Sequence, residues 1–181
     1  MRTNHLTGGL FALSLGAGCG SAATATPPAQ PNPEKVEQSI QNSLDRIHTL
    51  QIVDVSRLVL NLPAEATACY GIPCTDSDRQ KYQAERARQA PRVELLASLA
   101  EAAAHDSTIA PRDMSDKDAA LKALADLAVV EVSGLVETRP ANNPDCYNLP
   151  CGSDIELANK INGTRVAQVF AIVDAANKSG L

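Results

Sequence analysis

Residues 50–74, LQIVDVSRLVLNLPAEATACYGIPC, recur as residues 127–151, LAVVEVSGLVETRPANNPDCYNLPC. The two stretches align without a gap at a constant offset of 77 positions, and 12 of the aligned residues are identical. Chance would give about one or two identities over such a window, so the match indicates a repeated structural unit. The chain is therefore predicted to contain an internal duplication.

The repeat extends beyond these two stretches on both sides. Upstream, residues 44–47 match residues 121–124 at the same offset, and downstream, residues 92–103 match residues 165–176 at an offset of 73. The second copy thus lacks four residues, which is about one helical turn. A helix end can lose one turn and still bury the same face, so the same fold is expected in both copies.

Each copy is expected to begin with an amphipathic helix. In the first copy Asn32 precedes Pro33, which places a capping residue before a proline at the first helical position. In the second copy Ser115, followed three residues later by Asp118, is typical of a capping box. Both starts precede an apolar stripe at helical spacing, so a helix is predicted from each.

A strand and two further helices are predicted to follow. The β-branched runs at 52–55 and 129–132 favour strands over helices. After the cysteine loop of the first copy, a polar helix is expected to end before Pro91, and a closing amphipathic helix then begins. In the second copy the Asn-Gly pair at 162–163 is expected to make the equivalent break.

The fold class predicted from these elements is α/β (α+β), an internal duplication of two α-β-α-α units related by a pseudo-twofold. A small sheet with covering helices is expected. The first unit covers residues 33–104, a connector covers 105–114, and the second unit covers 115–181.

The two C-Y-x-x-P-C loops are the most specific motif in the chain. Four residues between two cysteines permit a local disulfide when the loop turns back, and proline helps to fix such a turn. Disulfides are therefore expected between Cys69 and Cys74 and between Cys146 and Cys151. The residues that the loops share are candidates for a rigid recognition loop: Tyr70, Pro73, Tyr147 and Pro150.

Two other roles for these cysteines remain open. Thiol exchange is disfavoured because redox-active pairs usually have two intervening residues and a cationic or helix-end environment. A four-cysteine zinc site would require the pseudo-twofold to bring both loops together with reduced thiols. We expect the loops to be structural staples that hold no metal and no cofactor.

Matching carboxylates on the two strands suggest a weaker hypothesis. Asp54 and Glu131 occupy equivalent positions, and a pseudo-twofold could bring them together as an acid and a base of a hydrolase. The residues around them lack the D-T-G pattern of aspartic proteases. Solvent-facing strand carboxylates are the ordinary explanation, so no catalytic residue is assigned.

A charged run follows the first cysteine loop. Arg79, Lys81, Glu85, Arg86 and Arg88 have the spacing of a solvated helix face. A binding face is the alternative interpretation.

The first residues have the plan of a secretory signal. Arg2 precedes an uncharged stretch whose apolar core of about ten residues is too short to span a bilayer. Leu15 to Cys19, LGAGC, resembles the lipobox of bacterial lipoproteins, although Gly16 stands where leucine is usual. The resemblance covers these residues only. It implies a signal peptide at 1–18 and fatty acyl chains, palmitate among them, on Cys19; an ordinary signal cut within residues 21–25 is the alternative.

The segment after Cys19 is expected to be a tether. Residues 20–32 are rich in Ala, Thr, Pro and Gln, a composition that cannot bury enough apolar surface to fold. Residues 19–32 are thus predicted to hold a globular part at a distance from a membrane surface.

Composition disfavours two classes of partner. Aromatic residues make up 3% of the chain and tryptophan is absent, which leaves few stacking platforms for sugars or single-stranded nucleic acid. A net charge of −5 also disfavours nucleic acid. Four cysteines remain once Cys19 is lipidated or removed, and an even number fits disulfides in an oxidising compartment.

These features together predict a noncatalytic bacterial lipoprotein of the cell envelope. We expect an anchor in the outer membrane facing the periplasm, with a soluble periplasmic or secreted protein as the alternative. The expected role is an interaction or assembly module with an envelope protein partner. Binding of a small ligand in a groove between the two repeats is the alternative, and a hydrolase is the third.

Overall fold

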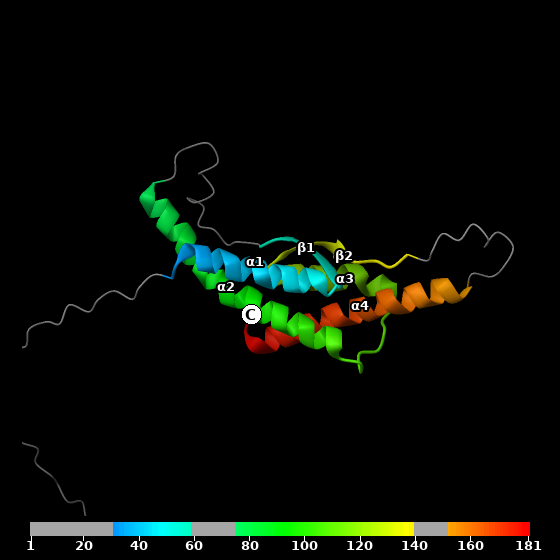
Figure 1. Ribbon diagram of the computed structural model, residues 1–181. Coiled ribbons are helices and arrows are strands. Elements are labelled where there is room, and N and C mark those ends of the chain that lie inside the picture. The colour runs from blue at the N-terminus through cyan, green and yellow to red at the C-terminus, as the bar shows by residue number, and fades with distance from the viewer. Residues whose placement is uncertain (1–30, 59–74, 140–151) are drawn as a thin grey trace, which may run out of the picture. The chain divides into compact units, whose positions relative to one another are not determined.

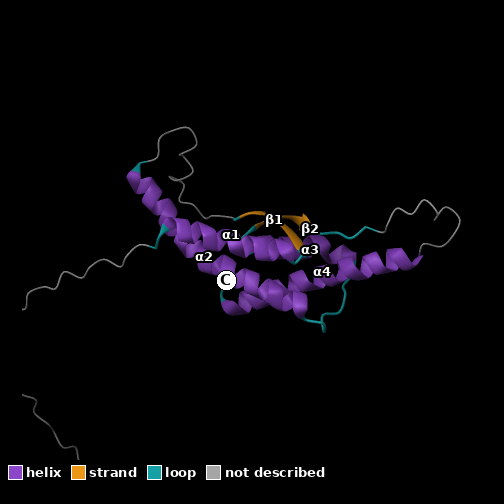
Figure 2. Ribbon diagram, viewed as in Figure 1, coloured by secondary structure: helices purple, strands orange, loops and turns teal. Residues whose placement is uncertain are grey.

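The computed structural model describes residues 31–58, 75–139 and 152–181, which belong to one compact unit, Pro31–Leu181. This unit is a mixed α/β fold that is mostly helical, with a two-stranded antiparallel sheet (Figures 1 and 2). The elements in chain order are α1 (Pro33–Thr49), β1 (Val53–Arg57), α2 (Asp76–His105), the 3-10 helix η2 (Met114–Asp116), α3 (Lys117–Asp126), β2 (Glu131–Leu135) and α4 (Gly152–Ser179).

Helix α1 begins as its sequence predicts. The Asn32 side chain accepts a hydrogen bond from the backbone N–H of Glu34 at 2.9 Å, and Pro33 occupies the first helical position. Ile40 and Ile47 are buried on the inner face. The predicted helix start is therefore confirmed, because the cap and the apolar stripe are both local signals.

The two strands leave their preceding helices through the same kind of turn. Gln51 and Ala128 both have a φ of 53°, and these are the two non-glycine residues with positive φ in the described chain. Left-handed backbone is uncommon outside glycine, asparagine and aspartate, so two occurrences 77 positions apart are informative. They turn the chain from a helix end into a strand that packs over the helices.

Strands β1 and β2 pair antiparallel, and their inner residues cover the helices. Val53 pairs with Leu135, and both side chains are buried. The outer residues Asp54, Ser56 and Ser133 are exposed. This alternation is the one expected for a sheet with one face on a core and the other in water.

The core lies between the sheet and the long helices. Helix α2 packs against both α1 and α4, and α4 also packs against α3. Val93 of α2, Val129 before β2 and Val166 and Val169 of α4 are fully buried. Each such side chain stabilises the fold by about 1.5–3 kcal/mol through removal from water. Small and branched aliphatic residues therefore build the core.

The break predicted before Pro91 does not occur. Helix α2 runs without interruption from Asp76 to His105, with Pro91 in its interior. An interior proline removes one hydrogen bond and costs about 3 kcal/mol. Ala90 and Val93, on either side of it, are buried against the neighbouring helices, and burial on both sides offsets this cost.

The break predicted at the Asn-Gly pair is also wrong. Helix α4 continues through Asn162 and Gly163, which are both buried. The Arg112 backbone N–H donates to the Gly163 carbonyl at 3.0 Å, and a Cβ on Gly163 would overlap the Arg112 carbonyl oxygen. Glycine here permits close approach of the connector, so it does not mark a turn. In the described residues one helix, instead of the expected two, follows each cysteine loop.

The capping box predicted at Ser115 is absent as well. Ser115 lies inside the 3-10 turn η2, and its N–H donates to the carboxylate of Asp113 at 2.8 Å. Asp113 therefore caps this turn, and α3 begins only at Lys117 without a side-chain cap.

Candidate interaction surfaces

The residues of the predicted lipidation site and cysteine loops lie outside the described residues. They are Cys19, Cys69, Tyr70, Pro73, Cys74, Cys146, Tyr147, Pro150 and Cys151. The description of the chain stops at Leu58 and resumes at Thr75 on either side of the first loop, and it stops at Arg139 and resumes at Gly152 on either side of the second. The lipid and both disulfides therefore stay predictions.

The strand register separates the two candidate carboxylates. Asp54 pairs across the sheet with Gly134, whereas Glu131 pairs with Arg57 and forms an ion pair with it. Glu131 is thus opposite a cation and not opposite Asp54. A shared-proton pair needs two carboxylates within contact distance, and this register does not place them opposite one another.

A small apolar cavity lies beneath the strands. Its volume is about 10 Å³, and aliphatic side chains from both halves of the chain line it, among them Ile47, Val53, Leu124 and Val130. That volume is about what a single water molecule requires, and the lining offers no polar partner to such a water. The cavity is therefore a packing gap and not a ligand site.

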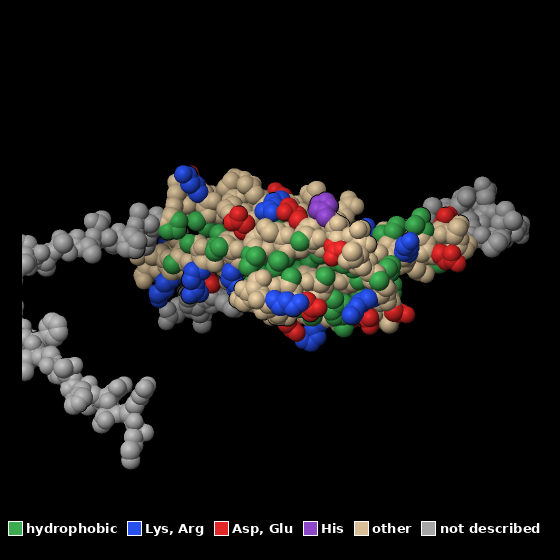
Figure 3. Space-filling view, turned by 90° about the horizontal axis from the view of Figure 1, so that it is seen from below, with side chains coloured by type: hydrophobic (Ala, Val, Ile, Leu, Met, Phe, Trp, Pro, Cys, Tyr) green, Lys and Arg blue, Asp and Glu red, His purple; other side chains and the backbone are tan. Residues whose placement is uncertain are grey.

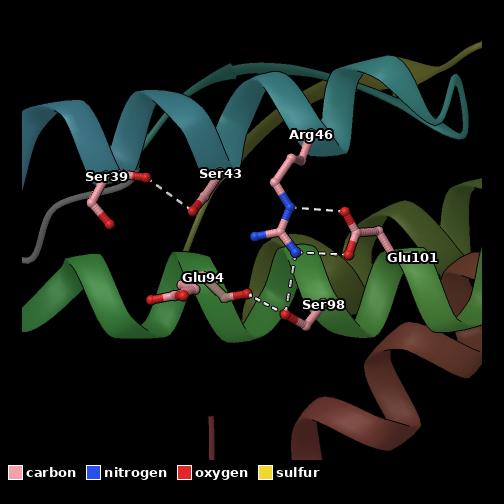
Figure 4. A network of polar contacts seen from close by, with 6 residues as sticks. All are labelled: Ser39, Ser43, Arg46, Glu94, Ser98 and Glu101. Carbon is pink, nitrogen blue, oxygen red and sulfur yellow. Dashed lines mark hydrogen bonds and ion pairs between the residues drawn. The ribbon is translucent and has the colours of Figure 1, made fainter.

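A larger, shallow groove of about 440 Å³ lies between α1 and the middle of α2. Polar side chains line it: Lys35, Gln38, Ser39, Asn42, Ser43, Arg46 and Glu94. Ser43 is buried although it is polar, and its hydroxyl donates to the Ser39 carbonyl at 3.0 Å (Figure 4). The sequence analysis did not predict this groove. The sequence signal for it is Ser43, a serine at a buried position of α1 where an aliphatic residue would be expected.

Arg46 and Glu101 join the two helices across this groove. The guanidinium donates to both carboxylate oxygens, at 2.8 Å from Nε and 2.7 Å from Nη2, and also contacts the Ser98 hydroxyl at 3.4 Å (Figure 4). The Glu101 hydrogen bond raises the pKa of Arg46, and the same bond lowers the pKa of Glu101. Both groups therefore stay charged near neutral pH.

The polar groups of the groove are largely engaged with one another. Among the described residues, every buried side-chain nitrogen or oxygen has a hydrogen-bond partner. The six-residue network of Figure 4 contains three serines and no histidine to act as a base. The arrangement suits contact with a polar protein surface better than nucleophilic chemistry.

The first half of α2 forms a charged surface next to α1. The prediction that its charged run is a solvated helix face is only partly confirmed. Glu85 is buried and forms an ion pair with Arg88, while Arg86 forms an ion pair with Glu37 of α1. The bond to Glu37 raises the pKa of Arg86. Part of the charged run thus holds the two helices together, and the rest is exposed.

The start of α2 is fixed by a capping box. The Thr75 hydroxyl accepts from the Asp78 N–H at 3.3 Å, and the Asp78 carboxylate accepts from the Thr75 N–H at 3.1 Å and from its hydroxyl at 2.6 Å. These bonds lower the pKa of Asp78, first through the hydroxyl and then through the backbone N–H. The helix therefore starts at a defined residue immediately after the first cysteine loop.

The described residues contain neither a metal-binding cluster nor a helix that could span a membrane. No three histidine, cysteine, aspartate or glutamate residues gather there in a way that could hold a metal ion. Within the same residues, no helix combines the length and the apolar character that crossing a membrane requires. The chain matches no protein family model, no curated protein and no solved structure.

Proposed function

We propose that this protein is a lipid-anchored module of the bacterial cell envelope that acts by binding a protein partner, without catalysis. The observation that carries the proposal is the order of segments along the chain. A lipobox-like LGAGC ends at Cys19, a proline-rich linker follows, and the compact unit begins at Pro31. This order is typical of a globular domain tethered to a membrane surface.

The described surfaces favour binding between proteins over enclosure of a small ligand. Small-molecule sites usually have volumes of roughly 300–1,000 Å³ and bury most of their ligand. The apolar cavity between the two halves is far smaller, and the larger groove is shallow and polar. A protein partner needs no enclosed pocket, because it binds across an extended surface.

The proposal includes the internal duplication, which the sheet register supports. Asp54 pairs with Gly134, and Arg57 pairs with Glu131. Under the offset of 77, Asp54 corresponds to Glu131 and Gly134 corresponds to Arg57, so the two pairs are equivalent. Val55 pairs with Val132, which is its own counterpart in the second copy. A pseudo-twofold axis through the middle of the sheet would produce this register.

Reciprocal side-chain bonds at the sheet give independent support. The Ser56 hydroxyl donates to the Glu131 carbonyl at 3.0 Å, and the Ser133 hydroxyl donates to the Asp54 carbonyl at 3.0 Å. Each bond is the image of the other under the same offset. The two left-handed turns before the strands obey it too.

The lipid anchor can be tested by intact mass. The full chain, expressed in a bacterial host and extracted from membranes with detergent, should begin at Cys19 and carry a diacyl or triacyl addition. A Cys19→Ala variant serves as the control and should lose both the mass addition and the membrane fraction. A soluble product that starts after Ala22 or Ala25 would contradict the proposal.

The interaction role needs a separate experiment. Native pull-down of the lipidated chain from solubilised envelopes should recover a defined protein partner, and substitutions on the exposed surface should abolish the recovery. Recovery of a stoichiometric small molecule with no partner would instead favour the ligand-binding alternative.

A further inference from the structure

The α1–α2 groove lies between two parallel helices and has an entirely polar wall on α1. The helices are parallel because Glu37 contacts Arg86 near the start of α1, while Arg46 contacts Glu101 farther along both helices. A helix face that borders another helix is usually apolar at helical spacing. The α1 wall has that spacing but consists of Lys35, Gln38, Ser39, Asn42, Ser43 and Arg46.

The second copy has alanine where the first copy has polar residues in and beside this groove. Five positions follow this pattern under the offsets of 77 and 73: Asn42/Ala119, Ser43/Ala120, Arg46/Ala123, Glu94/Ala167 and Ser98/Ala171. Buried residues next to them stay apolar in both copies, as Val93 and Val166 do. The proposed duplication therefore kept the chemistry of the core and changed the chemistry of the groove.

The polar residues of the groove contribute little to holding the helices together. The side chains of Arg46 and Glu101 are 39% and 37% exposed, and ion pairs in contact with water contribute little to stability. The corresponding helices of the second copy, α3 and α4, pack with Ala120 and Ala167 buried. A binding role therefore accounts for the polar residues of the first copy better than a role in stability.

Both walls of the groove offer groups to an incoming surface. Lys35 of α1 and Glu94 of α2 are exposed, and neither forms an ion pair with another described residue. The Asn42 side-chain oxygen accepts from Gln38 Nε2 at 2.8 Å, which leaves the Asn42 amide N–H groups as donors. In Figure 4 one nitrogen of Arg46 points away from Glu101, into the space between the helices. The groove thus presents a cation, a carboxylate and neutral donors.

We propose that the α1–α2 groove is the surface that binds the protein partner. The partner places an elongated polar segment there, with a carboxylate against Lys35 and a basic side chain against Glu94. This inference deepens the proposed function and rests on it, including the proposed duplication. The first copy is then the binding half of the molecule, and the second copy is its structural counterpart.

Charge complementarity favours a protein over other classes of ligand. A groove with one cation and one carboxylate that lack ion-pair partners does not select a polyanion such as nucleic acid or an anionic membrane. None of its lining residues is aromatic, which disfavours a glycan. Acidic and basic side chains are also interspersed on the face of the body that Figure 3 shows. Protein surfaces carry both signs, and opposite charges across an interface provide specificity.

Site-specific photocrosslinking tests the groove before the partner is identified. The photoreactive residue p-benzoylphenylalanine replaces Asn42 in the full chain, which is irradiated in cells of the native host. An adduct of one defined mass is expected, and mass spectrometry identifies the protein in it. The matched control carries the same residue in place of Ala119, which is exposed and corresponds to Asn42. The control should give no such adduct.

Two variants then remove the chemistry of the groove at exposed positions. Asn42→Ala/Glu94→Ala gives the first copy the residues of the second, and Lys35→Glu reverses the charge on the α1 wall. Each should weaken binding to the captured protein by about tenfold or more in calorimetric titration, because close charge pairs across an interface contribute strongly.

Matched controls make the same chemical changes on α4. Asn159→Ala/Glu156→Ala and Lys178→Glu alter exposed residues outside the groove and should bind like the parent. Circular dichroism melts check that every variant folds. Losses as large in these controls as in the groove variants would overturn the inference.

Failure of the inference differs from failure of the proposed function. If the partner is recovered but crosslinks equally at positions 42 and 119, or binds the groove variants as well as the parent, the partner role stands and the inference is wrong. If neither photocrosslinking nor native pull-down recovers a protein, the proposed function is wrong and so is the inference.

Discussion

Gly163 lies inside α4, where glycine is less favourable than alanine by about 1 kcal/mol. Its lack of a side chain allows the Pro111–Arg112 backbone to lie against the helix, with Pro111 Cβ 3.3 Å from the position that a Cβ would occupy. Gly163→Ala should therefore destabilise the protein by about 2 kcal/mol, because overpacking outweighs the gain in helix propensity. The melting temperature should fall by about 4–8 °C.

Gly134 provides a matched control for this substitution. It lies in β2, and nothing is within 4 Å of the position of its absent Cβ. Gly134→Ala should thus leave the melting temperature nearly unchanged or raise it slightly. Equal melting temperatures for the two variants would show that close approach of the connector does not constrain residue 163.

The same residues show why a local motif misled the sequence prediction. An Asn-Gly pair normally indicates a turn. Asn162 instead accepts from the Thr138 N–H at 2.7 Å and donates to the Thr138 carbonyl at 2.9 Å. These partners lie 24 residues away, so the pair serves contacts between segments that a local motif cannot reveal.

At the scale of elements, Pro91 offers a sharp test of the continuous helix α2. Alanine at this position would restore the backbone N–H that can donate to the Ala87 carbonyl, and it would fit the helical conformation. Pro91→Ala should therefore raise stability by about 1 kcal/mol or more, measured by thermal or urea unfolding, with no loss of helical circular dichroism. The sequence-based expectation of a helix end makes the opposite prediction, a loss of stability.

Local signals predicted the start of α1 and the two strands, but they failed for the start of α3 and for the continuous helices α2 and α4. The Asn32–Pro33 start of α1 and the β-branched strands follow from residues within a few positions of each element. Helices α2 and α4 continue through Pro91 and Gly163 because buried side chains before and after those residues pack on other helices. Packing energy of that kind depends on the tertiary fold, which a local pattern does not encode.

At the scale of the molecule, the candidate surfaces were partly foreseeable. The charged run in the first half of α2 was visible in the sequence, although the burial of Glu85 and the Arg86–Glu37 ion pair were not. The polar groove combines residues about 50 positions apart, such as Arg46 and Glu94. Its two sides meet only because α1 and α2 pack in parallel.

The last prediction concerns which cysteines of the two loops form disulfides with each other, because the arrangement of the helices limits the possible pairs. Helices α2 and α4 begin at opposite ends of the compact unit (Figure 1). Thr75, which directly follows Cys74, is therefore far from Gly152, which directly follows Cys151. A disulfide requires Cα atoms within about 7 Å, so pairing within each loop, Cys69 with Cys74 and Cys146 with Cys151, is favoured over pairing between loops.

Each local disulfide should stabilise the fold modestly, because a six-residue ring restricts the unfolded chain less than a long one. Replacing both cysteines of one loop with serine should cost about 2 kcal/mol and lower the melting temperature by about 4–8 °C, without changing localisation. The same change in the other loop should cost a similar amount, and the two effects should add because the loops are distant. Nonreduced peptide mapping that links one loop to the other, or free thiols in protein taken from the envelope, would contradict the staples and renew the case for a metal or redox role.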